Sequence, residues 1–169
     1  MRNIELKARL RDRGHALGVC TELGAAPKGD IHQVDTYFVV PRGRLKLREA
    51  EPGRTELVFY ERPDLPGPKG CDYRLEPATP GLKTVLAESL GVLAVVEKTR
   101  TLFLWENVRI HLDRVAELGD FVEFEAVLDA TRNDADGHRK LDRLTAAFGL
   151  EPADHVPASY LELTLGASQ

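Results

Sequence analysis

The sequence predicts an α+β fold that is mainly antiparallel β: a closed or nearly closed tunnel barrel of eight or nine strands, with a polar, charged lumen and a few helices packed outside. Two observations lead to this fold class. Strand-like segments alternate charged with apolar residues, as in residues 44–48 (RLKLR) and 121–125 (FVEFE). In addition, three amphipathic segments each need an apolar surface to cover. Because alternate strand residues point to opposite faces, helices on the apolar face would leave the charged face inside.

Nine segments have strand character, and short turns separate several of them. Turn residues at 41–43 (PRG) and 51–53 (EPG) make the region 34–62 an expected antiparallel meander. The second half of the chain repeats this arrangement, with turn candidates at 106–107 and 117–120. The predicted strands cover residues 2–10, 34–40, 43–50, 55–62, 70–78, 94–105, 107–114, 120–128 and 158–165.

Helical patterns are fewer and cover residues 11–24, 80–90 and 134–148. The last is the clearest, because Leu141, Leu144 and Phe148 recur at helical spacing and Gly149 follows. A β-sandwich is the alternative arrangement, in which the charged face would meet bulk water. The amphipathic helices favour the barrel, since each must lie on the apolar face of the sheet.

Length and composition describe one domain over residues 1–169, with 43% hydrophobic and 30% charged residues. The net charge of −4 argues against a nucleic-acid partner, which would need a dominant basic field. No apolar run approaches the roughly 20 residues of a membrane span, and the charged start of the chain is unlike a secretory signal. Cys20 and Cys71 are isolated, which is typical of two thiols in a reducing cytoplasm.

Strand parity assigns a set of side chains to the inside of the barrel. Cations so dense in a low-dielectric interior would repel one another unless an anion bridges them, and phosphate suits both Arg and Lys. Carboxylates beside that anion are explained by hard cations such as Mg²⁺ or Mn²⁺. A solvated sheet face with cross-strand ion pairs is the other interpretation. The inward set comprises Asn3, Glu5, Lys7, Arg9, Asp35, Tyr37, Arg44, Lys46, Arg48, Glu56, Tyr60, Arg62, Asp72, Arg74, Glu76, Lys98, Arg100, Arg109, His111, Asp113, Glu123, Glu125, Tyr160 and Glu162.

These residues resemble the CYTH superfamily, the triphosphate tunnel metalloenzymes, which include class IV adenylyl cyclases and thiamine triphosphatases. The family begins with a Glu-x-Glu-x-Lys strand, and here that strand reads Asn3-Ile4-Glu5-Leu6-Lys7. The resemblance covers nearly the whole chain and keeps the family's order. Its other segments are 35–38 (DTYF), 45–48 (LKLR), 97–100 (EKTR), 112–115 (LDRV), 118–125 (LGDFVEFE) and 159–162 (SYLE).

The resemblance implies a triphosphate held in the tunnel by Lys and Arg side chains, with Mg²⁺ or Mn²⁺ beside it. The implied triphosphate ligands are Lys7, Arg44, Lys46, Arg48, Arg62, Arg74, Lys98, Arg100 and Arg109. The implied metal ligands are Glu5, Glu123 and Glu125, and the implied catalytic residues are Lys7, Arg100 and Asp113. His111 shares the inward parity and could contact substrate, transfer a proton or simply be hydrogen-bonded in the lining.

Two departures from the family pattern leave the reaction open. Asn3 replaces the first glutamate, so it brings no negative charge to a metal site, and the strand near Arg62 lacks the family's usual lysine. The resemblance still implies a metal-dependent enzyme that cleaves a phosphoanhydride bond of a triphosphate, most like a class IV adenylyl cyclase. A triphosphatase and a catalytically weak triphosphate-binding module remain alternatives, and a purely structural partner protein is a third. A homodimer is also compatible with the sequence.

Overall fold

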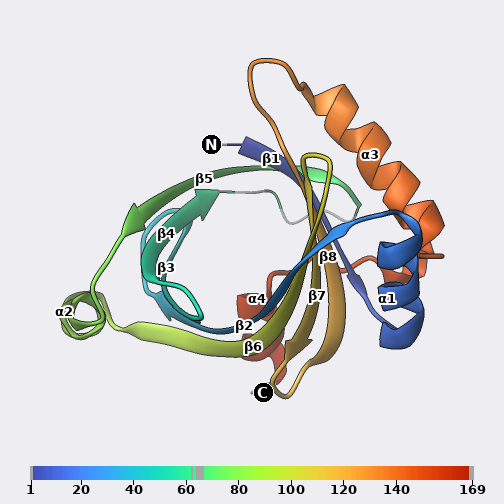
Figure 1. Ribbon diagram of the computed structural model, residues 1–169. Coiled ribbons are helices and arrows are strands. Elements are labelled where there is room, and N and C mark those ends of the chain that lie inside the picture. The colour runs from blue at the N-terminus through green and yellow to red at the C-terminus, as the bar shows by residue number, and fades with distance from the viewer. Residues whose placement is uncertain (1, 62, 64–66, 168–169) are drawn as a thin grey trace.

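The computed structural model describes residues 2–61, 63 and 67–167, and within them eight antiparallel strands close into a barrel (Figure 1). The strands follow one another around the barrel in the order β1-β5-β4-β3-β2-β6-β7-β8, and β8 pairs with β1. The predicted fold class is confirmed. The strands are β1 (Arg2–Arg9), β2 (Ala26–Phe38), β3 (Arg44–Glu51), β4 (Thr55–Glu61), β5 (Lys69–Pro77), β6 (Val92–Trp105), β7 (Val108–Val115) and β8 (Gly119–Val127).

Three helices lie where the sequence predicts them: α1 (Arg13–Glu22), α2 (Gly81–Leu90) and α3 (Asp134–Ala147). The side chain of Asp12 caps α1 by accepting from the backbone N–H of His15, and Asn133 caps α3 in a capping box with Asp136. None of the helices in the described residues is both long enough and apolar enough to span a bilayer.

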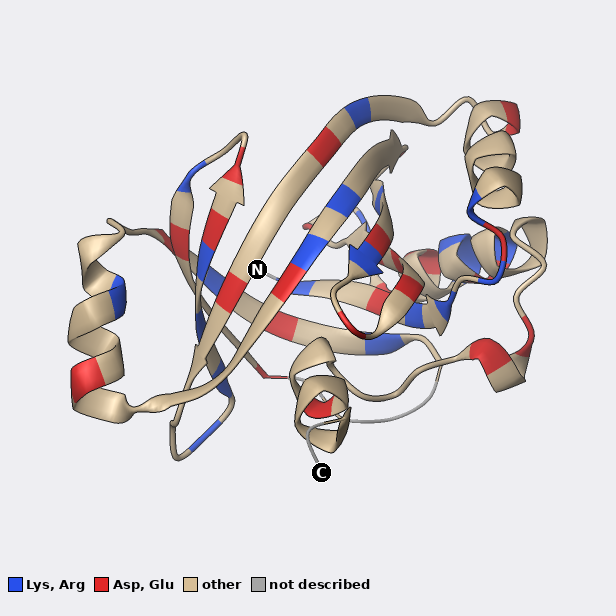
Figure 2. Cartoon of the chain, turned by 90° about the horizontal axis from the view of Figure 1, so that it is seen from below, with Lys and Arg blue, Asp and Glu red and all other residues tan. Residues whose placement is uncertain are grey.

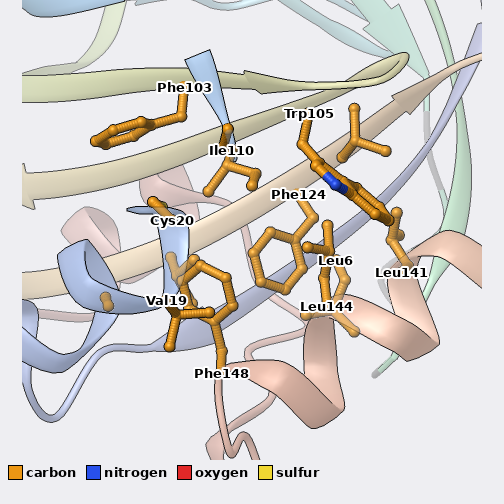
Figure 3. Close-up of a cluster of buried hydrophobic side chains, with 14 of the residues drawn as sticks. Leu6, Val19, Cys20, Phe103, Trp105, Ile110, Phe124, Leu141, Leu144 and Phe148 are labelled. Atoms are coloured by element: carbon orange, nitrogen blue, oxygen red, sulfur yellow. The ribbon is translucent and has the colours of Figure 1, made fainter. Parts of the chain in front are cut away.

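The apolar core lies outside the barrel, between the sheet and two helices (Figure 3). Helices α1 and α3 cover the outer face of β1, β7 and β8, where alternate apolar residues are almost completely buried. Leu141 and Leu144 of α3 pack with Leu6 and Phe124 of the sheet. Burial of this face stabilises the fold, and it leaves the opposite face of the same strands to line the lumen.

The prediction of a ninth strand over residues 158–165 is wrong, because this segment forms helix α4 (Tyr160–Ala167). Ser159 and Glu162 start the helix reciprocally: the Ser159 backbone N–H donates to Glu162 (2.6 Å), and the Glu162 N–H donates to the Ser159 hydroxyl oxygen (3.2 Å). The letters SYLE are thus a capping signature of the S-x-x-E type. Their alternation of apolar and polar residues also fits a strand, which explains the error.

Helix α4 lies at one end of the barrel, where it packs against β6 (Figure 1). Tyr160 and Leu161 are buried in an apolar cluster with Tyr37, Val96 and Phe121, all of which come from the barrel strands. The Tyr160 ring meets Phe121 edge-to-face, with ring centroids 5.1 Å apart. The lumen is therefore blocked at this end, which we call the closed end, and the opposite end is called the mouth.

The inward parity predicted for β5 is also wrong. Asp72, Arg74 and Glu76 point outward and are exposed, whereas Cys71 and Tyr73 face the lumen. Neither cluster of buried apolar residues covers this outer face: one lies beneath α1 and α3, and the other includes Cys71 on the lumen side of β5. The outer face of β5 therefore meets water and carries the charges, so the rule that places charged residues inside is reversed there.

Candidate functional site

A cavity of about 240 Å³ occupies the lumen, and charged side chains from most of the strands line it (Figure 2 shows the charges recurring along the barrel wall). On β6, Lys98, Arg100 and Leu102 face the cavity in turn. Lys98 lies beside Tyr160, with 4.8 Å between its ammonium nitrogen and the ring centroid, so Leu102 marks the mouth. The charged lining residues are Glu5, Lys7, Lys46, Arg48, Glu56, Lys98, Arg100, Arg109, Glu123 and Glu125.

The Asp35 cluster, which comprises Asp35, Lys46 and Arg48, forms where β2 pairs with β3. The Asp35 carboxylate accepts from Lys46 Nζ (2.7 Å) and from Nε and one terminal nitrogen of Arg48 (2.8 and 2.9 Å). Burial alone would raise the pKa of Asp35, but Arg48 and Lys46 outweigh it and hold that pKa well below its usual range. The carboxylate thus stays ionised and fixes both cations at the cavity wall.

The Asp113 cluster, which comprises Asp113, Lys98, Arg100 and Tyr160, repeats this arrangement where β6 pairs with β7. Arg100 donates twice to Asp113 (2.7 and 2.6 Å), Lys98 lies 3.5 Å away, and the Tyr160 hydroxyl donates from α4 (2.9 Å). Burial opposes ionisation of Asp113, but Arg100 and Lys98 keep its pKa well below the ordinary value. Burial and the adjacent Arg100 lower the pKa of Lys98 to about 7.

The acidic part of the lining is a group formed by Glu123, Glu125 and His111, whose potential ligand atoms lie within 4.8 Å of one another. Glu123 and His111 are cross-strand partners on β8 and β7. Burial disfavours the ionised form of Glu123, but Lys7 and Arg100 outweigh this and lower its pKa. For His111, burial and Arg100 lower the pKa to about 4, so the imidazole is neutral at pH 7.

These donors fit a small hard cation. Two ionised carboxylates and one neutral imidazole converge, and His111 Nδ1 has no hydrogen-bond partner among the described residues. Such a set of two carboxylates and one imidazole suits a hard or borderline divalent cation better than a soft metal. Glu5 lines the same cavity and pairs in register with Glu125, although it lies outside the group of three. The Asn3 amide oxygen, on the same strand, is buried and has no hydrogen-bond partner in the part of the chain that the structure describes.

The structure brings nine of the predicted site residues to the cavity lining: Lys7, Lys46, Arg48, Lys98, Arg100, Arg109, Glu5, Glu123 and Glu125. Asp113 lies directly behind this lining, where it holds Arg100. Arg44 lies toward the closed end and pairs with Glu162 of α4 (2.5 Å). Arg74 lies outside the barrel, so its assignment as a triphosphate ligand is corrected. Arg62 lies outside the described residues.

Several lining residues lie on β2 ahead of the predicted strand, which begins at residue 34, whereas the observed strand begins at Ala26. The observed strand runs through a bulge between Pro27 and Gly29, which resembles a loop in the sequence. As a result Ile31 and Gln33 were not considered, although both face the cavity. The uncharged lining residues Val58, Cys71, Tyr73, Leu75 and Leu102 were missed because only charge was used to choose the inward face.

Comparisons with known proteins agree with this architecture. A model of the CYTH domain family matches residues 1–160. A structure from Pyrococcus horikoshii shares 24% identity over 95% of this chain and 98% of its own, with a TM-score of 0.79. A candidate adenylate cyclase from Vibrio parahaemolyticus shares 20% identity over 96% and 97% of the two chains (TM-score 0.74). Another, from Hippeastrum, is described as having a dominant triphosphatase activity; it shares 15% identity over 98% and 96% (TM-score 0.63). Among curated proteins, none matches the sequence.

Proposed function

The chain belongs to the CYTH domain family, and from this premise we propose that it is a metal-dependent enzyme that binds a triphosphate in its tunnel and cleaves a phosphoanhydride bond. The observation that carries the proposal is the cavity of the lumen, in which fixed cations meet a group of carboxylates. Lys46, Arg48, Lys98 and Arg100 are the residues assigned to the phosphates. The acidic side, with Glu5, Glu123 and Glu125, is assigned to Mg²⁺ or Mn²⁺.

The balance of charges among the described lining residues supports binding of the triphosphate as a complex with a divalent metal cation. Six cationic side chains line the cavity, and four carboxylates line it with them. Asp35 and Asp113 lie behind that wall and neutralise two of the cations. A bare triphosphate would therefore bring an excess of negative charge into a buried space, which is strongly unfavourable. The carboxylates of the lining would hold a divalent cation, which would offset that excess and supply Lewis-acid chemistry to the phosphoryl oxygens.

The preferred reaction is of the class IV adenylyl cyclase type. The 3′-oxygen of the ribose attacks the α-phosphorus, the bond to the bridging oxygen of pyrophosphate breaks, and the hydroxyl proton is released. The chain's own part is to neutralise charge and to align the reacting groups, because the two Asp clusters hold their arginines and lysines before substrate arrives. Asp113 acts as a positioning residue for Arg100 in this scheme.

The alternative function is a triphosphatase, in which water attacks the terminal phosphorus. The Hippeastrum protein with a dominant triphosphatase activity, which has the same fold, favours keeping this candidate. Incubation with Mg²⁺ or Mn²⁺ and ATP, inorganic triphosphate or thiamine triphosphate separates the two. Cyclic AMP with pyrophosphate supports the cyclase, and orthophosphate supports the triphosphatase. Triphosphate binding without any product would identify a binding module instead, and absence of both binding and turnover would overturn the proposal.

A further inference from the structure

Tyr160, the first residue of helix α4, reaches from the closed end into the part of the lumen that is assigned to the phosphates. The Lys7 ammonium nitrogen lies 4.1 Å from the centroid of the Tyr160 ring, and the Lys98 ammonium nitrogen lies 4.8 Å from it. Both distances are within the range of a cation–π interaction. One ring on the C-terminal helix therefore contacts two lysines, which come from β1 and β6.

The Tyr160 ring is held in place through its hydroxyl and its edge. The hydroxyl donates to Asp113 Oδ2 (2.9 Å), and burial together with Asp113 raises the pKa of Tyr160 well above its ordinary value, so this donor stays protonated. The ring meets Phe121 edge-to-face. Lys7 also donates to the backbone carbonyl of Ala158, in the segment that leads into α4 (3.4 Å). The ring and the lysines thus form a fixed arrangement before any ligand binds.

A neutral ring and a carboxylate hold a lysine in different ways. A carboxylate cancels the charge of the ammonium group, as Asp35 does for Lys46 (2.7 Å). The electron-rich face of an aromatic ring attracts the ammonium group but leaves its positive charge available to an anion on the other side. Asp113 lies 3.5 Å from Lys98 Nζ, but both of its oxygens already accept hydrogen bonds from an arginine. The Tyr160 ring therefore orients Lys98 and adds no negative charge to its surroundings.

We propose that Tyr160 is a positioning residue of the phosphate site: its ring holds Lys7 and Lys98 with their charges directed at the bound phosphates, so that helix α4 is part of this site. The inference deepens the proposed function, on which it rests. Cations that are oriented in advance bind an anion more tightly, because fewer side-chain rotamers are lost on binding. Without the ring, the two ammonium groups would turn toward carboxylates of the lining such as Glu123, and less of their charge would face the ligand.

The test measures the affinity of the full chain for inorganic triphosphate by calorimetry, in the presence of Mg²⁺. Tyr160→Leu removes the ring, so the affinity should fall by about tenfold or more, because both lysines lose their cation–π contact. Tyr160→Phe keeps the ring and loses only the hydroxyl, so the affinity should fall by less than about threefold. Replacement of Tyr160 by pentafluorophenylalanine keeps a ring of similar shape but makes its face electron-poor, and it should weaken binding as much as Tyr160→Leu does.

Leu161→Ala is the matched control, because Leu161 is the next residue of α4 and is buried in the same apolar cluster (5% exposed, against 4% for Tyr160) but lies outside the cavity lining. It should lower the melting temperature, as Tyr160→Leu does, and change the triphosphate affinity by less than about twofold.

Three results would refute the positioning role and leave the proposed function standing. They are wild-type affinity in Tyr160→Leu, equal affinities with phenylalanine and pentafluorophenylalanine at position 160, and a loss in Leu161→Ala as large as that in Tyr160→Leu. If the wild-type chain does not bind triphosphate at all, the proposed function fails and the inference fails with it.

Discussion

The Asp35 cluster and the Asp113 cluster are two versions of one arrangement, and they occupy neighbouring strand pairs of the barrel, β3–β2 and β6–β7. In each, a buried aspartate holds an arginine through two hydrogen bonds and has a lysine beside it. An arginine fixed in this way loses little conformational freedom when it binds phosphate, because its orientation is set in advance. Both clusters therefore prepare cations for an anion in the lumen.

The clusters differ in what else they contact. The Asp35 cluster contains the cations Lys46 and Arg48, and the Arg48 side chain remains 17% exposed. In the Asp113 cluster, Arg100 also donates to Glu123 (3.2 Å), and Tyr160 of α4 donates to Asp113. This second cluster thus joins the cationic wall, the acidic wall and the closed end. The same ion-pair geometry therefore serves two purposes. In the Asp35 cluster it presents cations to the lumen, and in the Asp113 cluster it also links the cationic wall to Glu123 and to helix α4.

The largest effect is expected from removing the charge of each aspartate in turn. Asp113→Asn should lower the free energy of unfolding by about 3–5 kcal/mol, because the buried Arg100 loses its main counter-charge. Asp35→Asn should cost less, since water can reach Arg48. Urea denaturation at pH 7 measures both changes.

Asp120→Asn is the control for this pair of variants, because Asp120 binds the exposed Arg114 and its loss should cost less than about 1 kcal/mol. Equal losses for Asp35→Asn and Asp113→Asn would show that burial of the partner cation does not distinguish the clusters.

Glu123 distinguishes the two clusters, because Arg100 of the Asp113 cluster donates a hydrogen bond to it. Glu123→Gln keeps the shape of the side chain and removes its charge, so the affinity for Mn²⁺ should fall by about tenfold or more. The measurement is the rise in melting temperature with added Mn²⁺. Glu56→Gln changes a carboxylate on β4, which β5 and β1 separate from β8 and which is not part of the group of His111, Glu123 and Glu125, so it should leave that rise intact. Persistence of the full rise in Glu123→Gln would refute the ligand assignment.

Lys98 provides a pH test of the Asp113 cluster. Its pKa of about 7 in the free protein results from burial and from Arg100. Bound phosphate favours the charged ammonium, so binding takes up a proton wherever the free protein lacks it. Below pH 7 the ammonium is already charged and this contribution is constant; above pH 7 triphosphate affinity should fall by up to about tenfold per pH unit. Calorimetry between pH 6 and 9 measures the slope.

Lys98→Arg separates this titration from others, because a guanidinium stays charged over the whole range. Its affinity should be nearly independent of pH above 7. A wild-type affinity that is flat between pH 7 and 9 would contradict the assigned pKa of Lys98.

Asn3 tests whether the acidic wall beside the Asp113 cluster has lost a ligand. Asn3→Glu adds a carboxylate to the strand that carries Glu5, so Mn²⁺ affinity should rise by about three- to tenfold. Without metal the same variant should melt at a lower temperature, because position 3 is buried and burial disfavours the new charge. Asn3→Gln, which adds length without charge, should not raise the affinity; unchanged affinity in Asn3→Glu would count against a lost ligand.

Much of this site could be predicted from the sequence, because the outer faces of β1, β7 and β8 are covered by α1 and α3. On those strands alternation has one meaning: apolar residues face the helices, and charged residues such as Glu5 and Glu123 face the lumen. The order of the charged segments along the chain then suffices to place them on neighbouring strands. The ion pairs at Asp35 and Asp113 follow from register, which no single segment reveals.

The remaining features could not be predicted because they depend on tertiary context. The sequence does not say that the outer face of β5 is uncovered, and so Arg74 was given the wrong face. The segment that closes the tunnel has the alternation of a strand, and only the Ser159–Glu162 pair indicates its helix. Gln33 shares the inward parity of Asp35 and Tyr37, but it lies outside the predicted strand, because β2 begins at Ala26 in a segment whose Pro27 and Gly29 locally favour a loop.

The smallest effect on triphosphate affinity is expected from replacing Arg74. This variant tests whether a cation outside the two clusters contributes to binding. Arg74→Ala removes a cation that lies outside the barrel, on the face of β5 opposite to Tyr73. Triphosphate affinity should change by less than about twofold, because the intervening sheet and solvent screen the charge. Arg48→Ala, measured beside it by calorimetry, should lower the affinity by about tenfold or more, since Arg48 lines the cavity. Similar losses for the two variants would mean that general positive charge, rather than the cations held by Asp35 and Asp113, attracts the ligand.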